Sequence, residues 1–286
     1  MKDYVIFTDS CADLSPEVYQ ELNLRVVQLE VIVEGDAPVP GDQIDIKEIY
    51  AKLRDKKTAT TSAANLDTFL KLFEDTVQEG LDVLYLGFSS GLSSTYNAAT
   101  LAMKELSEKY PDSKLYAVDT LCASMGQGLL VSYAAWMKKD GATIEEVRDY
   151  VESNKLNLCH WFTVDDLFFL KRGGRVSAAT AVVGSLLNIK PVLHVDNAGK
   201  LINVSKVRGR KAAVDTLFEN MKKSMLPEQK AVYISHGDCI ADAEYLANRI
   251  QNELGISNVQ INFIGPVIGS HSGPGTLALF FLGNVR

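Results

Sequence analysis

The chain has 286 residues, of which 47% are hydrophobic and 23% charged. This length suits two domains, or alternatively one large α/β domain, and the composition is that of an ordinary globular protein. The net charge of -7, from 36 acidic and 29 basic residues, argues against a general nucleic-acid or membrane-surface binder, because such proteins need a basic field. No apolar run has the length of a membrane span and no signal peptide is recognisable, so we expect a soluble, cytoplasmic protein without stable membrane insertion.

Strand-like and helix-like segments alternate through the first half of the chain. Ser15-Pro16-Glu17 has the cap, the early proline and the acid that are typical of a helix start. From Leu66 to Val77, apolar residues recur with helical spacing. The alternation predicts a mostly parallel, Rossmann-like sheet with helices on both faces. The expected strands span residues 4–7, 24–33, 83–86 and 114–118, with helices beginning near residues 16, 66 and 96.

The second half has a different pattern. Asp196-Asn197-Ala198-Gly199 lies between apolar segments at 192–195 and 201–204, which is a hairpin signal. Further strands at 161–164, 232–235 and 259–264 alternate with helical stripes. We therefore expect a C-terminal α+β domain with antiparallel strands. The boundary is predicted near residue 155, which gives domains at 1–155 and 156–286.

Four loops are rich in hydroxyl groups or glycine, and ligands in open α/β sheets collect where strands end and helices begin. The loop at 87–95 precedes a predicted helix, whose free N–H groups suit a carboxylate or phosphate. It contains no lysine, which argues against a P-loop. The other three loops span residues 60–63, 170–177 and 264–275.

The segment from Gly87 to Gly91 matches the Gly-x-Ser-x-Gly pattern of a nucleophile elbow, with Ser89 in the nucleophile position. A serine acyl-hydrolase is therefore one candidate function. In such an elbow the helix begins at the nucleophile itself, whereas here a second glycine and further hydroxyl residues precede the helical pattern. Helix capping and loop structure are the alternative roles of these hydroxyl groups.

Cationic and imidazole side chains stand in the remaining loops. Arg172, Arg175, Arg208 and Arg210 are candidates for a basic docking patch, or alternatively for ordinary solvated surface. His271 lies in a glycine-rich loop and is a site candidate. The histidines show no metal-binding spacing and the four cysteines are far apart, so neither a metal site, a disulfide framework nor a cofactor is expected.

These loops together resemble the DegV family of fatty-acid-binding proteins. The resemblance runs over nearly the whole chain and follows the family's order of motifs. Each motif alone is weak, and the ordered set is specific. The matching pieces are Phe7-Thr8-Asp9-Ser10, Thr61-Ser62, Ser89-Ser90-Gly91-Leu92-Ser93, Leu170 to Val176, and Gly265 to Gly269 running into His271-Ser272-Gly273-Pro274-Gly275.

The resemblance implies a carrier that is not itself an enzyme. It implies one long-chain fatty acid buried between two α/β domains, and a fatty acid kinase as the partner that phosphorylates the carboxylate for lipid synthesis. The head-group roles fall on Thr61, Ser62, Ser93, Ser94 and His271. Two departures lie beside this site: Ala63-Ala64 replaces a frequent Gln-Pro, and Ser94 replaces a frequent glycine.

The chemistry of a fatty acid fits such loops. Each buried methylene contributes about 0.8 kcal/mol, so an apolar tunnel supplies most of the affinity, and a few neutral donors at a helix start can hold the carboxylate. Three functions remain open at this point: a fatty-acid carrier serving a kinase, a serine acyl-hydrolase using Ser89, and a binder of phosphosugars or other small anions.

Overall fold

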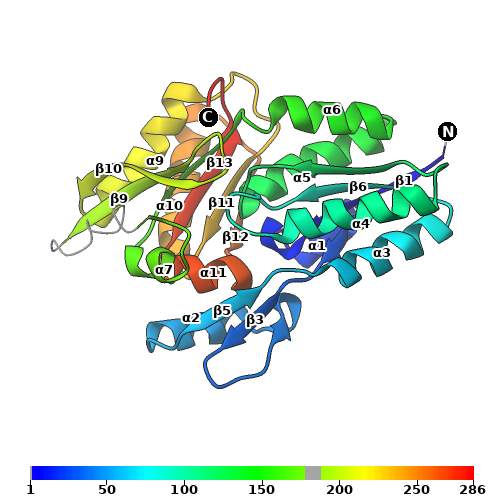
Figure 1. The fold of residues 1–286 in the computed structure, drawn as a ribbon. Coiled ribbons are helices and arrows are strands. Elements are labelled where there is room, and N and C mark those ends of the chain that lie inside the picture. The colour runs from blue at the N-terminus through cyan, green and yellow to red at the C-terminus, as the bar shows by residue number, and fades with distance from the viewer. Residues whose placement is uncertain (1, 178–187) are drawn as a thin grey trace.

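The computed structural model describes residues 2–177 and 188–286, and its described strands form two larger sheets and one small sheet. Figure 1 shows the two larger sheets side by side, with the small sheet below them. The four-stranded sheet has the order β2-β1-β6-β7, and the six-stranded sheet has the order β10-β9-β8-β13-β11-β12. The change from one to the other falls between β7 and β8. The predicted α/β architecture is thereby confirmed, with a parallel sheet first and a mostly antiparallel one second.

The N-terminal sheet is parallel throughout, and helices cover both faces. In β1, Tyr4 and Ile6 face one hydrophobic cluster, whereas Val5 and Phe7 face the other, as the alternation of side chains along a strand requires. Ser15 caps α1 by accepting a hydrogen bond from the Val18 amide, as predicted. The elements are β1 (Tyr4–Asp9), η1 (Ser10–Ala12), α1 (Pro16–Glu21), β2 (Arg25–Val27), α3 (Leu66–Gln78), β6 (Asp82–Gly87), α4 (Thr95–Lys109), β7 (Leu115–Asp119), α5 (Met125–Lys139) and α6 (Ile144–Asn154).

The single strand predicted at 24–33 is wrong. The chain instead forms β2, which joins the parallel sheet, and β3, which joins the small antiparallel sheet β4-β3-β5. The ladder breaks at Leu29, whose amide donates to Ser10 Oγ and whose carbonyl accepts from the Gly41 amide. The small sheet and its helix comprise β3 (Glu30–Val33), β4 (Val39–Pro40), η2 (Gly41–Gln43), α2 (Ile46–Arg54) and β5 (Ala59–Ser62).

The last strand in the chain, β13, lies in the middle of the six-stranded sheet, between β8 and β11. The predicted hairpin is confirmed as β9 and β10, joined by the turn from Asp196 to Gly199. The elements are β8 (Leu158–Thr163), α7 (Leu167–Arg172), β9 (Ile189–Val195), β10 (Leu201–Arg208), α9 (Arg210–Ser224), β11 (Val232–His236), α10 (Ile240–Leu254), β12 (Val259–Phe263), α11 (Pro266–Ser272) and β13 (Leu277–Leu282).

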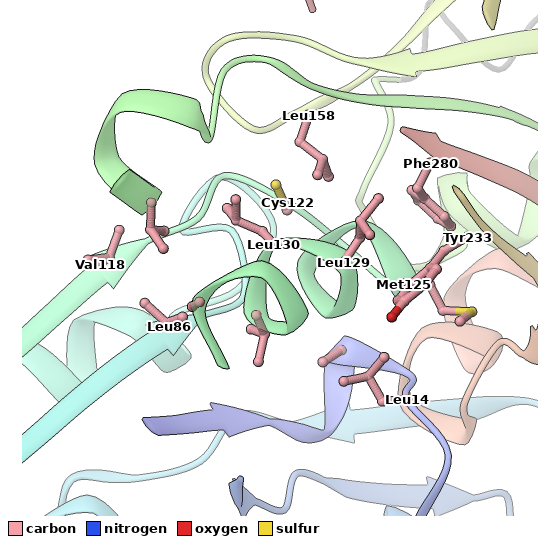
Figure 2. Packing of buried hydrophobic residues seen from close by; sticks show 14 of the residues in the cluster. Leu14, Leu86, Val118, Cys122, Met125, Leu129, Leu130, Leu158, Tyr233 and Phe280 are labelled. Atoms are coloured by element: carbon pink, nitrogen blue, oxygen red, sulfur yellow. The ribbon is translucent and has the colours of Figure 1, made fainter. Parts of the chain in front are cut away.

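Helix α5 packs between the two larger sheets. Figure 2 shows Leu86 and Val118 of the first sheet on one side of this helix and Tyr233 and Phe280 of the second sheet on the other. These residues belong to one buried cluster, so the two halves share a continuous hydrophobic core along α5. Within residues 2–177 and 188–286, no helix combines the length and the apolar character that a membrane crossing requires.

Candidate functional site

A cavity of about 250 Å³ lies where the two halves of the chain meet. Its wall is mostly apolar, and both halves contribute to it. The polar residues of the wall include four that the sequence predicted for the head-group site: Thr61, Ser93, Ser94 and His271. The apolar residues lining the cavity are Leu29, Ala63, Phe88, Leu92, Ala123, Phe162, Leu170, Val195, Leu201, Ile264, Val267, Ile268, Ala278 and Phe280, together with Cys11.

Thr61 and His271 meet at the wall of this cavity. Thr61 comes from β5 and His271 from the last turn of α11, and Thr61 Oγ1 lies 2.8 Å from His271 Nε2. The other ring nitrogen, Nδ1, has no hydrogen-bond partner among the described residues. It faces Gly173, where a Cβ would lie 2.4 Å from it. The ring is therefore held between a hydroxyl group and a glycine.

The imidazole of His271 is neutral at ordinary pH. Burial, with the neighbouring Arg175 and Arg172 guanidinium groups, lowers its pKa to about 4. A neutral ring carries one proton. When that proton is on Nε2, the ring donates to Thr61 Oγ1, and the Thr61 hydroxyl is left free to donate to a group in the cavity. His271 can thus orient the Thr61 hydroxyl.

Ser93 and Ser94 reach the cavity from the loop before α4. The Ser93 Oγ lies 2.9 Å from Thr95 Oγ1 and accepts a hydrogen bond from the Thr95 amide. Ser94 is exposed at the rim and its side chain makes no capping hydrogen bond. Ser62 belongs to β5, next to Thr61, and is not among the residues that line the cavity. Neighbouring side chains of a strand point to opposite faces, so only one of this pair reaches the site.

Arg175 lines the cavity, which the sequence interpretation missed. It was assigned to a docking patch, and the head group was expected to meet neutral donors only. Its side chain is half-buried, its Nε donates to the Leu92 carbonyl at 3.2 Å, and its Nη1 donates to the Gly173 carbonyl. The cavity wall therefore holds a guanidinium group beside His271. The sequence offered one signal for this position: Arg175 stands between two apolar residues, Leu170 and Val176. Both are buried in the structure.

The other three arginines differ in their surroundings. Arg172 is exposed and lies over the Phe169 ring at 4.9 Å. Arg208 is exposed at the end of β10. Arg210, by contrast, is partly buried and forms ion pairs with Asp242 at 2.9 Å and Asp165 at 3.6 Å. Of the four predicted docking residues, only Arg172 and Arg208 present a guanidinium to solvent.

Ser89 is fully buried. Its Oγ donates to the Gly199 carbonyl at 2.8 Å and accepts from the Gly91 amide at 3.2 Å. Its described hydrogen-bond partners include no histidine that could act as a general base. The serine therefore holds the turn of the β9–β10 hairpin on the loop that follows β6.

Asp9 contacts the loop that follows β6. Its Oδ2 accepts hydrogen bonds from the Tyr85 hydroxyl at 2.7 Å and from the Phe88 amide at 2.9 Å. Asp9 therefore braces the loop that follows β6. Among the described residues, no group of three or more histidine, cysteine, aspartate or glutamate side chains could hold a metal ion.

The chain is similar over its full length to proteins of one family. The family model described as an uncharacterised protein of the DegV family matches residues 3–284. A DegV domain-containing protein of Clostridium perfringens is 47% identical, covering 100% of this chain and 99% of the relative. A DegV lipid-binding protein of Thermotoga maritima has a TM-score of 0.87 at 32% identity, covering 99% of both chains. A DegV family protein of Thermus thermophilus, described by its fatty-acid binding, has a TM-score of 0.88 at 30% identity, covering 99% of this chain and 100% of the other.

Proposed function

Because the chain belongs to the DegV family, we propose that it binds one long-chain fatty acid in the cavity between its two halves and carries it without catalysing a reaction. The observation that supports this most is the division of the cavity wall. Apolar side chains form most of it, and Thr61, Ser93, His271 and Arg175 contribute hydroxyl, imidazole and guanidinium groups. The wall also includes Ser94, Ser124, His160, Ser272 and Thr276, of which Ser124, His160 and Thr276 form hydrogen bonds within the protein. A wall of this kind suits an amphiphile with one anionic end.

The carboxylate would accept hydrogen bonds from the Thr61 and Ser93 hydroxyl groups. His271 would act behind Thr61 by fixing the direction of its hydroxyl, and the Arg175 guanidinium would supply a positive charge. Hydrogen bonds to a charged group contribute about 1.5–3 kcal/mol each. Ser94 would stand at the rim beside the head group, and Ser62 would support β5 from outside the cavity.

The acyl chain would supply most of the affinity. Each buried methylene contributes about 0.8 kcal/mol. A phosphosugar would leave the apolar wall unused and would place its own hydroxyl groups against Phe88, Phe162 and Phe280, which cannot hydrogen-bond them. The small-anion alternative is therefore less suited to this cavity than a fatty acid.

The finer part of the proposal concerns a partner. A fatty acid held with its carboxylate near the rim would be available to a fatty acid kinase in the cytoplasm. Arg172 and Arg208 are exposed cations on a chain with a net charge of -7. Exposed charges at the edge of an interface act mainly on the rate and the salt dependence of association. We assign these two arginines to docking of the kinase, with Arg175 acting at the head group and Arg210 within the fold.

The function is tested by identifying the ligand that purifies with the protein. Native mass spectrometry should show an added mass, and solvent extraction should recover a long-chain fatty acid in about equimolar amount. Delipidated protein should rebind a fatty acid and not a phosphosugar. Purified protein that carries no lipid and binds no added fatty acid would contradict the proposal.

A further inference from the structure

One strand of the cavity wall runs away from the proposed head-group residues Thr61 and His271. Thr276, Ala278 and Phe280 are alternate residues that line the cavity along β13 and its start. The hydroxyl of Thr276 donates to the Ser272 carbonyl at 2.9 Å, and Ser272 is next to His271. Since a strand rises about 3.3 Å per residue, Phe280 lies roughly 13 Å further along than Thr276. Phe280 is thus at the far end from His271.

At this far end, Phe280 meets His160 of β8. The two rings are perpendicular, at 90°, with their centres 5.3 Å apart. Both of the His160 ring nitrogens are engaged: Nδ1 lies 3.0 Å from the Leu158 carbonyl, and Nε2 accepts from the Ala123 amide at 3.2 Å. The ring is therefore held in one orientation, and it forms a fixed part of the cavity wall.

Gly126 of α5 packs closely against both rings, so they cannot move toward this helix. A Cβ at Gly126 of α5 would lie 2.3 Å from His160 Nε2 and 2.8 Å from Phe280 Cδ1. Helix α5 is held in turn by its packing between the two sheets (Figure 2). Interiors packed to this density do not yield to an added methylene without displacement of their side chains.

We propose that His160 and Phe280 form a rigid end stop that sets the longest acyl chain the protein accepts, with Gly126 holding the stop from behind. The proposal rests on the function proposed above and adds a selectivity to it. A fatty acid whose carboxylate is fixed near Thr61 cannot slide to relieve an overlong tail. Its terminal methyl would have to displace two rings that hydrogen bonds and α5 hold in place.

Two variants move the stop in opposite directions. Phe280→Leu removes ring atoms and deepens the cavity. Gly126→Ala adds a methyl group outside the cavity wall and pushes both rings inward. Ile268→Val is the matched control, because it enlarges the cavity by one methyl group at a residue of α11, near His271.

The measurement is a competition among saturated fatty acids that differ by two carbons, read by native mass spectrometry on delipidated protein. Phe280→Leu should shift the preferred length upward by at least one step, with about a tenfold change in the ratio of the dissociation constants of the longer and the shorter acid. Gly126→Ala should shift it downward, and Ile268→Val should leave it unchanged. If Gly126→Ala does not fold, the shift in preferred chain length of Phe280→Leu alone tests the proposal.

Two negative results have different meanings. If Phe280→Leu binds fatty acids with the wild-type length preference, the end stop is wrong and the carrier function is untouched. If Ile268→Val shifts the preference as much as Phe280→Leu does, general looseness of the cavity sets the length and the end stop is again wrong. Failure of the wild type to bind any fatty acid would instead overturn the function itself.

Discussion

Thr61 Oγ1 and His271 Nε2 lie 2.8 Å apart, although 210 positions separate the two residues in the chain. The contact joins the small sheet to α11 and gives the Thr61 hydroxyl a fixed direction. Because the imidazole is neutral, it can donate to the threonine oxygen and leave the hydroxyl proton for a ligand. The head group would then be bound by a hydroxyl group that is already oriented before the ligand arrives.

Removal of either head-group hydroxyl should weaken fatty-acid binding. Thr61→Ala and Ser93→Ala should each raise the dissociation constant about tenfold or more, because each removes a hydrogen bond to a charged group. Titration of delipidated protein with a fluorescent fatty acid measures this. Ser62→Ala, on the same strand but outside the cavity, serves as the control and should bind as the wild type does.

Gly173→Ala should weaken binding without touching the ligand. The added Cβ would lie 2.4 Å from His271 Nδ1 and displace the ring from Thr61. The expected loss is similar to that of Thr61→Ala, measured by the same titration. Gly174→Ala is a stringent control. Gly174 has a positive φ of 72°, and apart from its chain neighbours no atom of the described residues lies within 4 Å of an added Cβ, so the variant should lower stability and leave affinity unchanged. Equal affinity loss in both variants would argue against the contact.

His271 should make the free energy of unfolding depend on pH below neutrality. Its pKa is about 4 in the folded protein against an ordinary 6.5, so the unfolded chain binds a proton that the folded chain does not. Stability should therefore fall as pH falls from 6.5 to 4, with no contribution from this residue above that window. Urea unfolding at several pH values measures the slope.

The matched variant is His271→Asn, which cannot take up a proton in this range. Burial also lowers the pKa of His160, His194 and His236, and these residues act equally in both proteins. The variant should therefore lose stability less steeply with acid than the wild type. Parallel curves for the two proteins would show that His271 does not titrate as described.

Ser89→Ala should lower the stability of the protein, and it should not abolish a catalytic activity. The variant loses the hydrogen bond to the Gly199 carbonyl and leaves that buried acceptor unpaired, which costs about 1–3 kcal/mol. Thermal unfolding should show a lower Tm, with fatty-acid affinity nearly unchanged. An esterase assay with short acyl esters tests the competing function. Measurable turnover that vanishes in Ser89→Ala and persists in Ser93→Ala would favour the hydrolase.

Exposed arginines should govern the kinase reaction through its salt dependence. Arg172→Ala and Arg208→Ala should bind fatty acid normally and slow its phosphorylation, because they remove charges that steer association. The difference from the wild type should shrink as added salt screens these charges. Lys223→Ala, which removes an exposed charge from the last turn of α9, is the control. A fall in affinity that matches the fall in turnover would place the arginine at the head group instead.

Local signals predicted most of the fold. The apolar spacing from Leu66 predicted α3, and the turn at 196–199 predicted the hairpin, because each depends on residues close in sequence. The break between β2 and β3 could not be found in this way. It depends on Leu29, whose amide bonds Ser10 and whose carbonyl bonds Gly41, and neither partner is a sequence neighbour.

The candidate site was predicted in part. Thr61, Ser93, Ser94 and His271 line one cavity, although they come from three separate segments of the chain. The position of Arg175 was not anticipated, because an arginine beside two glycines is equally compatible with exposed and with half-buried settings. In the structure, Leu170 and Val176 on either side of this segment are buried, and Arg175 lies between them at the cavity wall.

The central place of β13 has a consequence for how the molecule is made. This strand spans Leu277–Leu282, close to the end of a 286-residue chain, and it is the partner through which β8 and β11 join one sheet. During synthesis from the N-terminus, β8 and β11 each keep one unpaired edge until β13, which follows every other described strand in the chain, has emerged from the ribosome. The lining of the cavity is then completed last, by Ala278 and Phe280. A nascent chain in which β13 has not yet emerged therefore lacks part of the cavity wall on which the proposed binding of a fatty acid depends.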